Sequence, residues 1–238
     1  MRLYGKNPVF ERVKTDPGSI KKLYLQKKVD LSELVKAIKA AGMQFESVDK
    51  EWFHKECGGI HSQGVLAEVD EYQYSSYDEV MDDCLSGKAV PVFLDGITDP
   101  QNLGAIIRTL ACMGGFSVVI PAHDSAEVNE TVLRVASGGE NYIKIAEVTN
   151  IATALGKLKG RGVTIAGAIP GGQNISGAEF NFPIAVVIGS EGRGIRPGVE
   201  KHLDLELELP MDGAPLSYNA SVAAALFCYE VRRLRAKG

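Results

Sequence analysis

From Ala89 onward, short apolar runs rich in Val and Ile alternate with segments of helical spacing, and this alternation constrains the fold more than any other feature. Such continuous runs are typical of strands that are covered on both faces, as in parallel sheets. The expected strands are VPVFLDGI, FSVVIP, YIKIAEV, VTIAGAI and IAVVIGS. The expected helices are GAIIRTLACMG, ETVLRVASGG, NIATALGKLKGRG and the final segment SVAAALFCYEVRRLRAKG. Residues 89–238 are therefore predicted to form an α/β domain with a parallel sheet.

Residues 1–69 are predicted to form a separate, small α/β domain. A short helix is expected at PVFERVK, a strand at LYLQ, an amphipathic helix at LSELVKAIKAAG and a second strand at GVLAEV. Residues 70–88 are acidic and rich in Tyr and Ser, which favours an exposed linker with one or two helical turns. Its tyrosines could stack on bases, but packing against a domain surface is the favoured interpretation.

Charge is unevenly distributed along the chain. The net charge is −4, yet residues 1–60 carry 12 Lys and Arg against 8 Asp and Glu, and residues 61–88 carry 1 against 7. The acidic balance therefore comes mainly from one short segment. The basic N-terminal domain remains free to contact phosphate, although a helix with a solvated Lys-rich face explains the charge equally well.

Several classes of protein do not fit the sequence. No apolar run approaches the ~20 residues that span a bilayer, and the N-terminus lacks the apolar core of a secretory signal, so we expect a cytosolic protein without a membrane partner. The four Cys and four His are scattered, which predicts free thiols rather than a zinc site or disulfides. No Walker motif and no GxGxxG after the first strand of the α/β domain is present, which disfavours a nucleotide-binding oxidoreductase.

The first of three candidate segments runs from Asp95 to Arg108. It leaves a strand, turns at Asp99-Pro100 and enters a helix, where Asn102 is expected to be the N-terminal cap. Arg108 lies less than two turns further on and is expected to point toward the same loop. Arginine is well suited to a bidentate grip on phosphate. A capped helix with a surface Arg is the plainer alternative.

The other two candidate segments follow later strands. Val187–Ile195 contains three glycines around Glu191, which allow a close approach of the backbone to a ligand. Leu209–Ser221 is a long polar turn that runs into the last helix and offers Ser217, Asn219 and Ser221 as polar groups. Open parallel sheets bind ligands where strands end, so all three segments are candidates for one site. Taken alone, each is only a turn or a helix cap.

Together, and in this order, the three segments resemble the motifs of the SpoU/TrmH branch of the SPOUT methyltransferases. The family pattern is N-x5-R, then IGxEGxG, then IPMxGxxxSLNVSxA. This chain has Asn102 and Arg108, then Ile188 to Gly194, then Leu209-Pro-Met-Asp-Gly and Ser217-Tyr-Asn-Ala-Ser. Leu209 stands where the family has Ile, and Tyr218 where it has Leu. Tyr4-Gly5 and Ser62-Gln-Gly-Val also resemble segments of the 23S rRNA guanosine methyltransferases in this family, so the likeness spans nearly the whole chain.

The resemblance implies an α/β domain with a deep trefoil knot, preceded by a ribosomal-protein-like RNA-binding domain. It implies S-adenosylmethionine as cofactor, RNA as partner, no DNA, and a homodimer whose interface contributes to the active site. The implied cofactor-binding residues are Gly189, Leu209, Tyr218, Ile188, Gly194 and Met211.

The implied reaction is attack of a ribose 2'-hydroxyl on the methyl group of the cofactor. Arg108 matches the family's catalytic position, and Asn102, Glu191, Ser217 and Asn219 are expected to position it, the ribose and the loops. A guanidinium stays protonated and is a poor base. We therefore hypothesise that Arg108 holds the substrate phosphate, and that the proton leaves through phosphate or a transiently neutral guanidinium.

The leading interpretation is methylation of a guanosine in 23S rRNA, either free or in an assembling large subunit. A tRNA or resistance-type rRNA methyltransferase of the same family is the second interpretation. A third, from another class, is an RNA-binding protein without catalysis, which retention of the five expected catalytic-site residues argues against.

Overall fold

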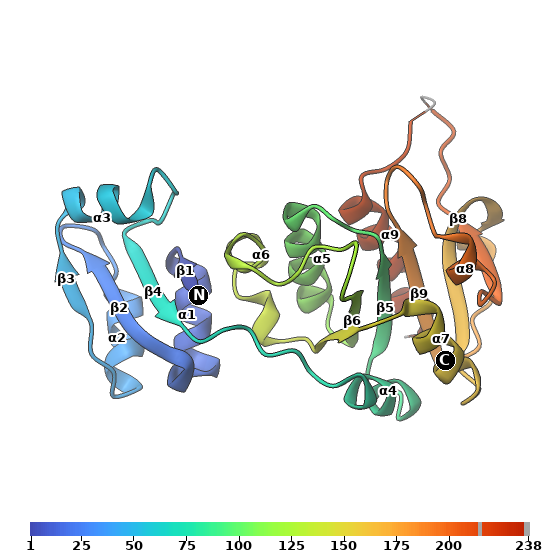
Figure 1. The fold of residues 1–238 in the computed structure, drawn as a ribbon, viewed down its shortest axis with the longest axis horizontal. Coiled ribbons are helices and arrows are strands. Elements are labelled where there is room, and N and C mark those ends of the chain that lie inside the picture. Colours follow the sequence, from blue (N-terminus) through green and yellow to red (C-terminus); the bar gives the residue numbers. More distant parts are fainter. Residues whose placement is uncertain (214–215, 236–238) are drawn as a thin grey trace.

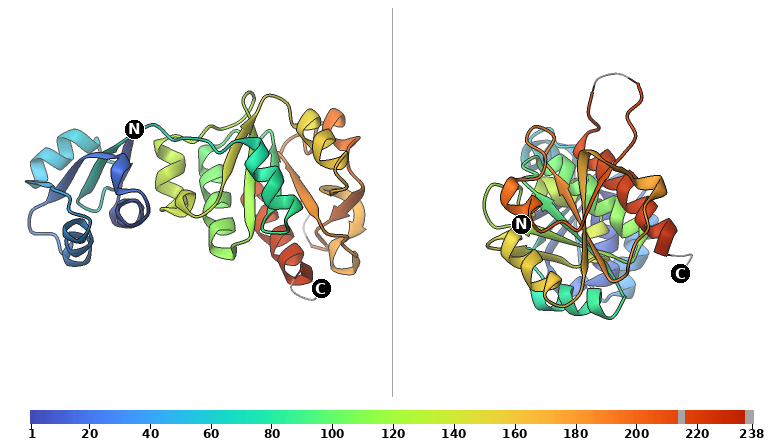
Figure 2. Two further views of the ribbon diagram at one scale, coloured as in Figure 1. Left: turned by 90° about the horizontal axis from the view of Figure 1, so that it is seen from below. Right: turned by 90° about the vertical axis from the view of Figure 1, so that its right-hand side faces the viewer.

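The computed structural model describes residues 1–213 and 216–235 and shows an elongated molecule with two units side by side (Figure 1). The first unit is built on a four-stranded sheet and the second on a six-stranded sheet. The view from below shows the same division, whereas in the view from the right-hand side the second unit lies in front of the first (Figure 2). Within the described ranges, no helix is both long and apolar enough to cross a membrane.

The first unit has a mixed sheet in the order β1-β4-β2-β3, in which β4 is antiparallel to both of its neighbours and β2 and β3 are parallel. Its elements are β1 (Arg2–Tyr4), α1 (Lys6–Thr15), η1 (Pro17–Ser19), β2 (Ile20–Gln26), α2 (Ser32–Ala40), β3 (Glu46–Val48), α3 (Lys50–Cys57) and β4 (Val65–Val69). The predicted helices at α1 and α2 and the strands at β2 and β4 are confirmed.

The second unit has an entirely parallel sheet in the order β10-β8-β9-β5-β6-β7. Its elements are α4 (Tyr77–Leu85), β5 (Val90–Asp95), α5 (Pro100–Met113), β6 (Phe116–Pro121), α6 (Glu130–Ala136), η2 (Gly139–Asn141), β7 (Ile145–Val148), α7 (Ile151–Lys159), β8 (Thr164–Asn174), η3 (Ile175–Gly177), β9 (Ile184–Gly189), α8 (Pro197–Glu200), β10 (Leu205–Glu208) and α9 (Ala220–Arg235). The predicted α/β fold with a parallel sheet is confirmed.

The parallel sheet is buried on both faces, as its continuous apolar strands predict. Every residue of β5 is buried, and successive side chains enter different cores: Val92 packs with α5 and α9, whereas Phe93 packs with α4 and α7. This alternation follows from the two-residue period of a strand. The short elements β1, β3, α8 and β10 escaped the sequence analysis because three or four residues carry too little periodicity to detect.

The segment expected to be an exposed linker at 70–88 is only partly one. Residues 77–85 form α4, which begins with a capping box of Ser76 and Glu79 and buries Val80 and Cys84 against the second sheet. The predicted packing of the tyrosines is confirmed: the Tyr77 hydroxyl donates to the Ala154 carbonyl (2.7 Å), and the Tyr74 hydroxyl accepts the Val128 N–H.

The two units share a buried contact between α1 and η2. Arg12 Nη2 lies 3.4 Å from Glu140 Oε1, and their side chains are 9% and 0% exposed. Burial raises the pKa of the Glu140 carboxyl, and the charge of Arg12 opposes the rise. One hydrophobic core also runs across the boundary and includes Leu3 and Val9 from the first unit and Val132 from the second. The first unit is therefore packed against the second.

Close packing of α5 on α6 depends on Gly104. A Cβ added there would lie 2.7 Å from Val135 Cβ and 2.9 Å from the Val132 carbonyl oxygen.

We predict that Gly104→Ala lowers the free energy of unfolding by about 1–3 kcal/mol, because the helices must separate. Gly156→Ala in α7 is the matched control, since its Cβ would meet nothing closer than 3.6 Å. It should leave stability unchanged or raise it by up to about 1 kcal/mol. Urea denaturation of both variants tests this, and equal effects would contradict it.

Candidate active site

The three candidate segments leave the carboxyl ends of parallel strands at one edge of the second sheet. The chain runs from β5 outward through β6 to β7, then returns so that β9 pairs with the other side of β5. The order reverses between β5 and β9, which is where open α/β sheets form a crevice. The segments after β5 and β9 flank this point, and the segment after β10 projects beyond the same edge (Figure 1).

One carboxylate oxygen joins all three segments. Glu191 Oε1 accepts hydrogen bonds from Asn102 Nδ2 (2.7 Å), Asn219 Nδ2 (3.0 Å) and the Ala220 N–H (3.0 Å). Asn219 Nδ2 also donates to Asn102 Oδ1 (2.9 Å). The structure thus brings Asn102, Glu191 and Asn219 together, although 89 residues separate the first two in sequence.

Asn219 has a second role at the start of α9. Its Oδ1 accepts from the Ser221 N–H (3.0 Å) and the Ser221 hydroxyl (2.6 Å). The side chain therefore fixes the first turn of the last helix while its amide group faces Glu191. A change in the conformation of the β9 segment would therefore alter the contacts that hold the beginning of α9.

The expectation that Asn102 caps α5 is wrong. The cap is Asp99, whose carboxylate accepts the Gln101 N–H at 2.8 Å. Proline directly after Asp99 has no N–H to donate and suits the first helical position, so the helix starts there. Asn102 lies inside the first turn, where its buried amide turns toward Glu191.

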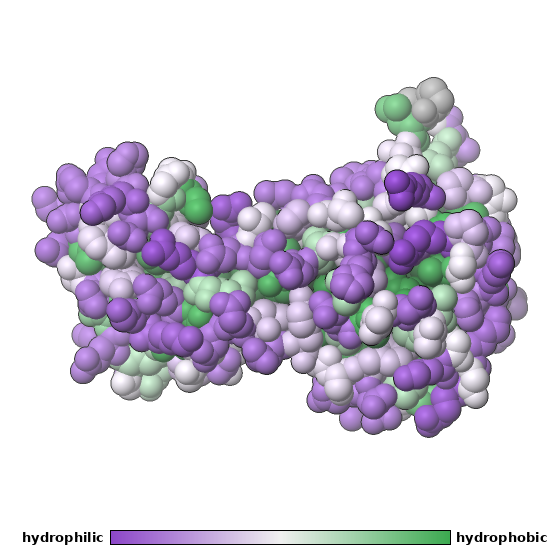
Figure 3. Space-filling model, viewed as in Figure 1, coloured by the Kyte–Doolittle hydropathy of each residue, from purple (hydrophilic) through white to green (hydrophobic). Residues whose placement is uncertain are grey.

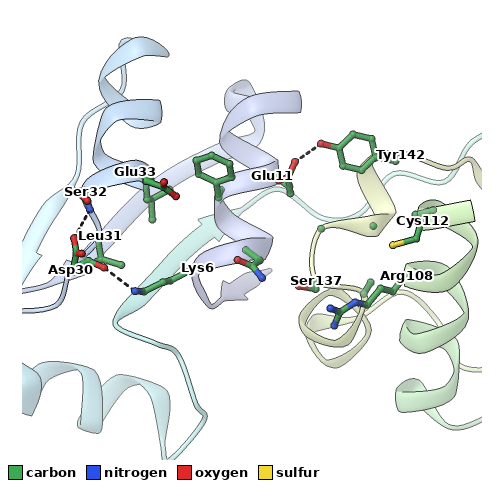
Figure 4. A pocket seen from close by; sticks show the side chains of 17 residues that line it. Lys6, Glu11, Asp30, Leu31, Ser32, Glu33, Arg108, Cys112, Ser137 and Tyr142 are labelled. Atoms are coloured by element: carbon green, nitrogen blue, oxygen red, sulfur yellow. Dashed lines mark hydrogen bonds between the residues drawn. The ribbon is translucent and has the colours of Figure 1, made fainter. Parts of the chain in front are cut away.

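Arg108 does not point toward the same loop as Asn102, contrary to the sequence-based expectation. Six residues along an α-helix correspond to a rotation of roughly 240° about its axis, so the two side chains leave α5 on different faces. Arg108 is exposed and lines a cavity of about 860 Å³ between α1 and α5, here named the inter-unit cavity (Figure 4). In a single chain Arg108 is therefore separate from the Glu191 network.

A second cavity, of about 450 Å³, lies between the segments that follow β9 and β10 and is here named the β9–β10 cavity. All six residues expected to bind cofactor line it: Ile188, Gly189, Gly194, Leu209, Met211 and Tyr218. Ser217 and Glu191 line it as well, whereas Asn102, Arg108 and Asn219 do not. The site residues thus divide into a group around this cavity, a linking network, and an isolated arginine.

Gly189 has no room for a side chain. Its added Cβ would lie 2.2 Å from the Gly194 carbonyl carbon, because the segment folds back on itself. Ser190 and Gly194 hold the fold with a reciprocal pair of backbone hydrogen bonds of 3.2 and 2.9 Å, and Gly194 has a φ of +65°. The glycines therefore make a tight loop that exposes backbone groups to the cavity.

Tyr218, which departs from the family pattern, is accommodated at the rim of the β9–β10 cavity. Its side chain is 39% exposed, and its hydroxyl donates to the Pro210 carbonyl at 3.1 Å. The ring of Tyr218, which is larger than the Leu of the family pattern, thus contacts the beginning of the loop that carries it. Leu209 is half-buried beside the core, where either Leu or Ile can pack.

The sequence analysis missed an ion pair beneath the loops. Asp95, at the end of β5, has a fully buried carboxylate that accepts from Arg196 Nε (2.7 Å) and from the Arg196 backbone N–H (2.8 Å). An acidic residue that closes an otherwise apolar buried strand was the available signal. This bidentate contact fixes the base of the β9 segment to the end of β5.

Comparison with known proteins identifies the family of this chain. The sequence profile of the SpoU rRNA methylase family matches residues 89–229, which include all three segments. The chain belongs to this family. A second profile, described as RNA 2'-O ribose methyltransferase substrate binding, matches residues 2–75.

Individual relatives extend the likeness to the full chain. The 23S rRNA (guanosine-2'-O-)-methyltransferase RlmB of Ralstonia nicotianae is 34% identical over 238 residues, which is 98% of this chain and 95% of the relative. The crystal structure of the SpoU methyltransferase AviRb from Streptomyces viridochromogenes, in complex with the cofactor AdoMet, superposes with a TM-score of 0.81 at 20% identity and covers 100% of this chain and 91% of its own. The TrmH/SpoU tRNA modifying enzyme of A. aeolicus covers 68% of this chain and 85% of its own, at 25% identity and a TM-score of 0.56.

The chain is thus an S-adenosylmethionine-dependent RNA 2'-O-ribose methyltransferase. The β9–β10 cavity fits this cofactor in chemistry. Ile188, Leu209 and Met211 offer apolar contacts, while Glu191, Glu200 and Glu208 supply carboxylates suited to a cationic sulfonium and to ribose hydroxyls. The absence of a Cβ at Gly189 lets the Gly194 backbone pack against it, and this tight turn forms part of the cavity wall. The described residues contain no cluster of three or more His, Cys, Asp or Glu side chains that could hold a metal ion.

Glu191→Ala tests whether the three-loop network shapes the cofactor cavity. The variant removes the acceptor that three donors share, and the loss is greatest for the buried Asn102, because an unsatisfied buried donor costs about 1–3 kcal/mol. Asn219 is exposed and keeps its bond to Asn102 Oδ1. We predict that its affinity for S-adenosylmethionine, measured by calorimetry, falls about tenfold or more. Glu191→Gln, which keeps an acceptor oxygen in place, should lose much less. Equal affinity of Glu191→Ala and the wild type would show that the network does not shape the cavity.

Proposed function

We propose that this enzyme methylates the 2'-hydroxyl of a guanosine in 23S rRNA, free or within an assembling large subunit, in the cytoplasm. The observation that carries the proposal is similarity along 98% of the chain to an enzyme named for that reaction. The likeness includes the first unit, residues 1–69, which we assign to RNA binding and which the substrate-binding profile matches. The tRNA modifying enzyme of A. aeolicus, in contrast, has no counterpart for the rest of this chain.

We further propose a division of chemical tasks among the predicted site residues. When bound, S-adenosylmethionine supplies an activated methyl group with its own leaving group, so the protein mainly aligns and desolvates. Ile188, Gly189, Gly194, Leu209, Met211 and Tyr218 would hold it in the β9–β10 cavity. Asn102, Glu191, Ser217 and Asn219 would fix the loops and orient the ribose.

Arg108 is the proposed catalytic residue. Its planar guanidinium keeps its charge and suits a bidentate grip on the phosphate next to the target ribose. Held there, that phosphate lies near the 2'-hydroxyl and can accept its proton as the methyl group transfers. A transiently neutral guanidinium is the alternative acceptor.

A homodimer would bring Arg108 to a cofactor. Arg108 lies away from the β9–β10 cavity of its own chain, which supports a site completed by a second copy. An apolar row on α9, formed by Val222, Leu226 and Tyr229, is 43–60% exposed at helical spacing. Figure 3 shows hydrophobic side chains on the projecting segment after β10, where Leu216 is 74% exposed. Burial of these groups is a physical reason for two chains to associate.

The deep trefoil knot is part of the same proposal. Family membership and the joint use of the β9 and β10 segments to line one cavity support it. In a knotted arrangement, one loop passes through another, so the cavity walls cannot separate without threading the chain.

Mapping of 2'-O-methyl sites in total RNA, with and without the gene, tests the substrate. We expect one guanosine of 23S rRNA to lose its methyl group in the deletion strain and to regain it with the wild-type gene but not with Arg108→Ala. Loss of a tRNA site instead would replace the proposed substrate with tRNA. No change at any site, with no binding of S-adenosylmethionine by calorimetry, would favour a non-catalytic RNA-binding protein.

Mixed dimers test the shared site. Arg108→Ala and Gly189→Ala, each purified alone, should be inactive, because the first lacks the phosphate grip and the second forces the Gly194 backbone away and distorts the wall of the β9–β10 cavity. After co-expression, we predict about a quarter of the wild-type rate, because half of the dimers are mixed and each of these has one intact composite site. Absence of any recovery, with mixed dimers shown by mass spectrometry, would place Arg108 and the cofactor of one site in the same chain.

A further inference from the structure

A third cavity, of about 600 Å³, lies on the first unit between the start of α1, α3 and residues 58–64, and is here named the basic cavity. Lys6, Lys50, His54 and His61 line it, and no Asp or Glu of the described residues does. This composition is unexpected in a chain with 30 acidic and 26 basic residues. The inter-unit and β9–β10 cavities each have three carboxylate side chains in their walls.

The cationic side chains of the basic cavity are available to a ligand. Within residues 1–213 and 216–235, the side chains of Lys50, His54 and His61 make no hydrogen bond or ion pair, and all three are exposed. Two of the carboxylates near this cavity are engaged elsewhere, and a third, Asp30, accepts the Ser32 N–H and also interacts electrostatically with Lys6. Asp49 accepts the Trp52 N–H at 2.8 Å, and Glu56 pairs with Arg2 at 3.2 Å.

The cavity wall is held in an unusual backbone conformation. Gln63 has a φ of +53°, which side-chain-bearing residues seldom adopt, and Gly64 follows with +74°. The Gln63 Oε1 accepts the Lys6 N–H at 2.9 Å, which ties the wall to the first turn of α1. Backbone conformations of this kind persist where surrounding contacts hold them, and they often occur at ligand sites. Phe53, which is buried, contributes to an apolar floor on which a ribose or base can rest.

Lys6 connects the basic cavity to the cavity that holds Arg108. It is the residue that lines both, and its Nζ donates to the Asp30 carbonyl oxygen at 2.8 Å rather than to a carboxylate (Figure 4). Lys6 thus lies between the basic cavity and Arg108 on α5, and Glu11, Asp30 and Glu33 also line the cavity that it shares with Arg108. The α3 end of the first unit also lies on the same side of the molecule as the projecting segment after β10 (Figure 1).

We propose that the basic cavity binds backbone phosphates of the RNA strand that flanks the methylated nucleotide, and that Lys6 guides this strand toward Arg108. The inference rests on the proposed function, because it assumes an RNA substrate. Phosphate fits a cavity with two ammonium groups, two imidazoles and no opposing carboxylate. The apolar floor favours a nucleotide strand over a free inorganic anion, because it offers contact to sugar or base as well as to phosphate. Lys6 and Lys50 are positioning residues in this scheme.

The test compares two double variants with the same change of charge. Lys6→Gln with Lys50→Gln removes cations from the basic cavity, whereas Lys36→Gln with Lys39→Gln removes two exposed lysines of α2 that line neither cavity. The probe is an unmethylated 23S rRNA transcript, and the Kd is measured as a function of KCl concentration. The first variant should bind the transcript about 10-fold more weakly than the wild type. A plot of the logarithm of the association constant against the logarithm of the KCl concentration should become less steep, with a slope smaller in magnitude by about 1–2. The control should change less than about 2-fold.

Kinetics separate positioning from loss of structure. In the cavity variant, KM for RNA should rise while kcat at saturating RNA and the affinity for S-adenosylmethionine stay at wild-type values. Lys50→Gln alone, at an exposed position, should show a smaller shift in the same direction. Equal RNA affinities of the cavity variant and the control would overturn the inference. Failure of the wild-type enzyme to methylate any RNA would instead overturn the proposed function, and the two failures are therefore distinguishable.

Discussion

The arrangement of the site depends on a single acceptor, Glu191 Oε1, which receives hydrogen bonds from the segments after β5 and β10. Each segment on its own is a flexible turn of small or polar residues. Held by one anionic oxygen, they take up one relative position, and Asn102 is buried in the process. Because a charged acceptor strengthens each bond, one carboxylate can order loops that apolar packing alone would not define.

The rest of the structure supports the hydrogen-bond network around Glu191 from two sides. Below it, the ion pair between the buried Asp95 and the exposed Arg196 secures the β9 segment to the central strand. Beside it, Gly104 lets α6 pack closely on α5, and α6 in turn contacts the first unit. The position of the first unit is thus set by the same helix that carries Asn102 and Arg108. The helix α5 therefore links the position of the first unit to that of the Glu191 network.

The sequence predicted the fold class and most long elements, because apolar runs and helical spacing report burial directly. The family resemblance pointed to six residues that line the β9–β10 cavity, and their role in cofactor binding stays a prediction. The sequence placed the cap of α5 at Asn102 instead of Asp99, because both residues are good caps and only the fold shows that Asn102 is needed elsewhere. The direction of Arg108 and the pairing of Asp95 with Arg196 depend on long-range packing, which local patterns do not encode.

The core that continues from Leu3 and Val9 to Val132 has an evolutionary consequence. An RNA-binding unit on a flexible tether can be exchanged between proteins without altering the catalytic unit. Here, removal of the first unit would expose apolar side chains of α6 and leave the buried carboxylate of Glu140 without its partner Arg12. A replacement unit would need an apolar face that fits Val132 and a cation placed opposite Glu140, so exchange of this unit requires matched residues on both sides of the boundary.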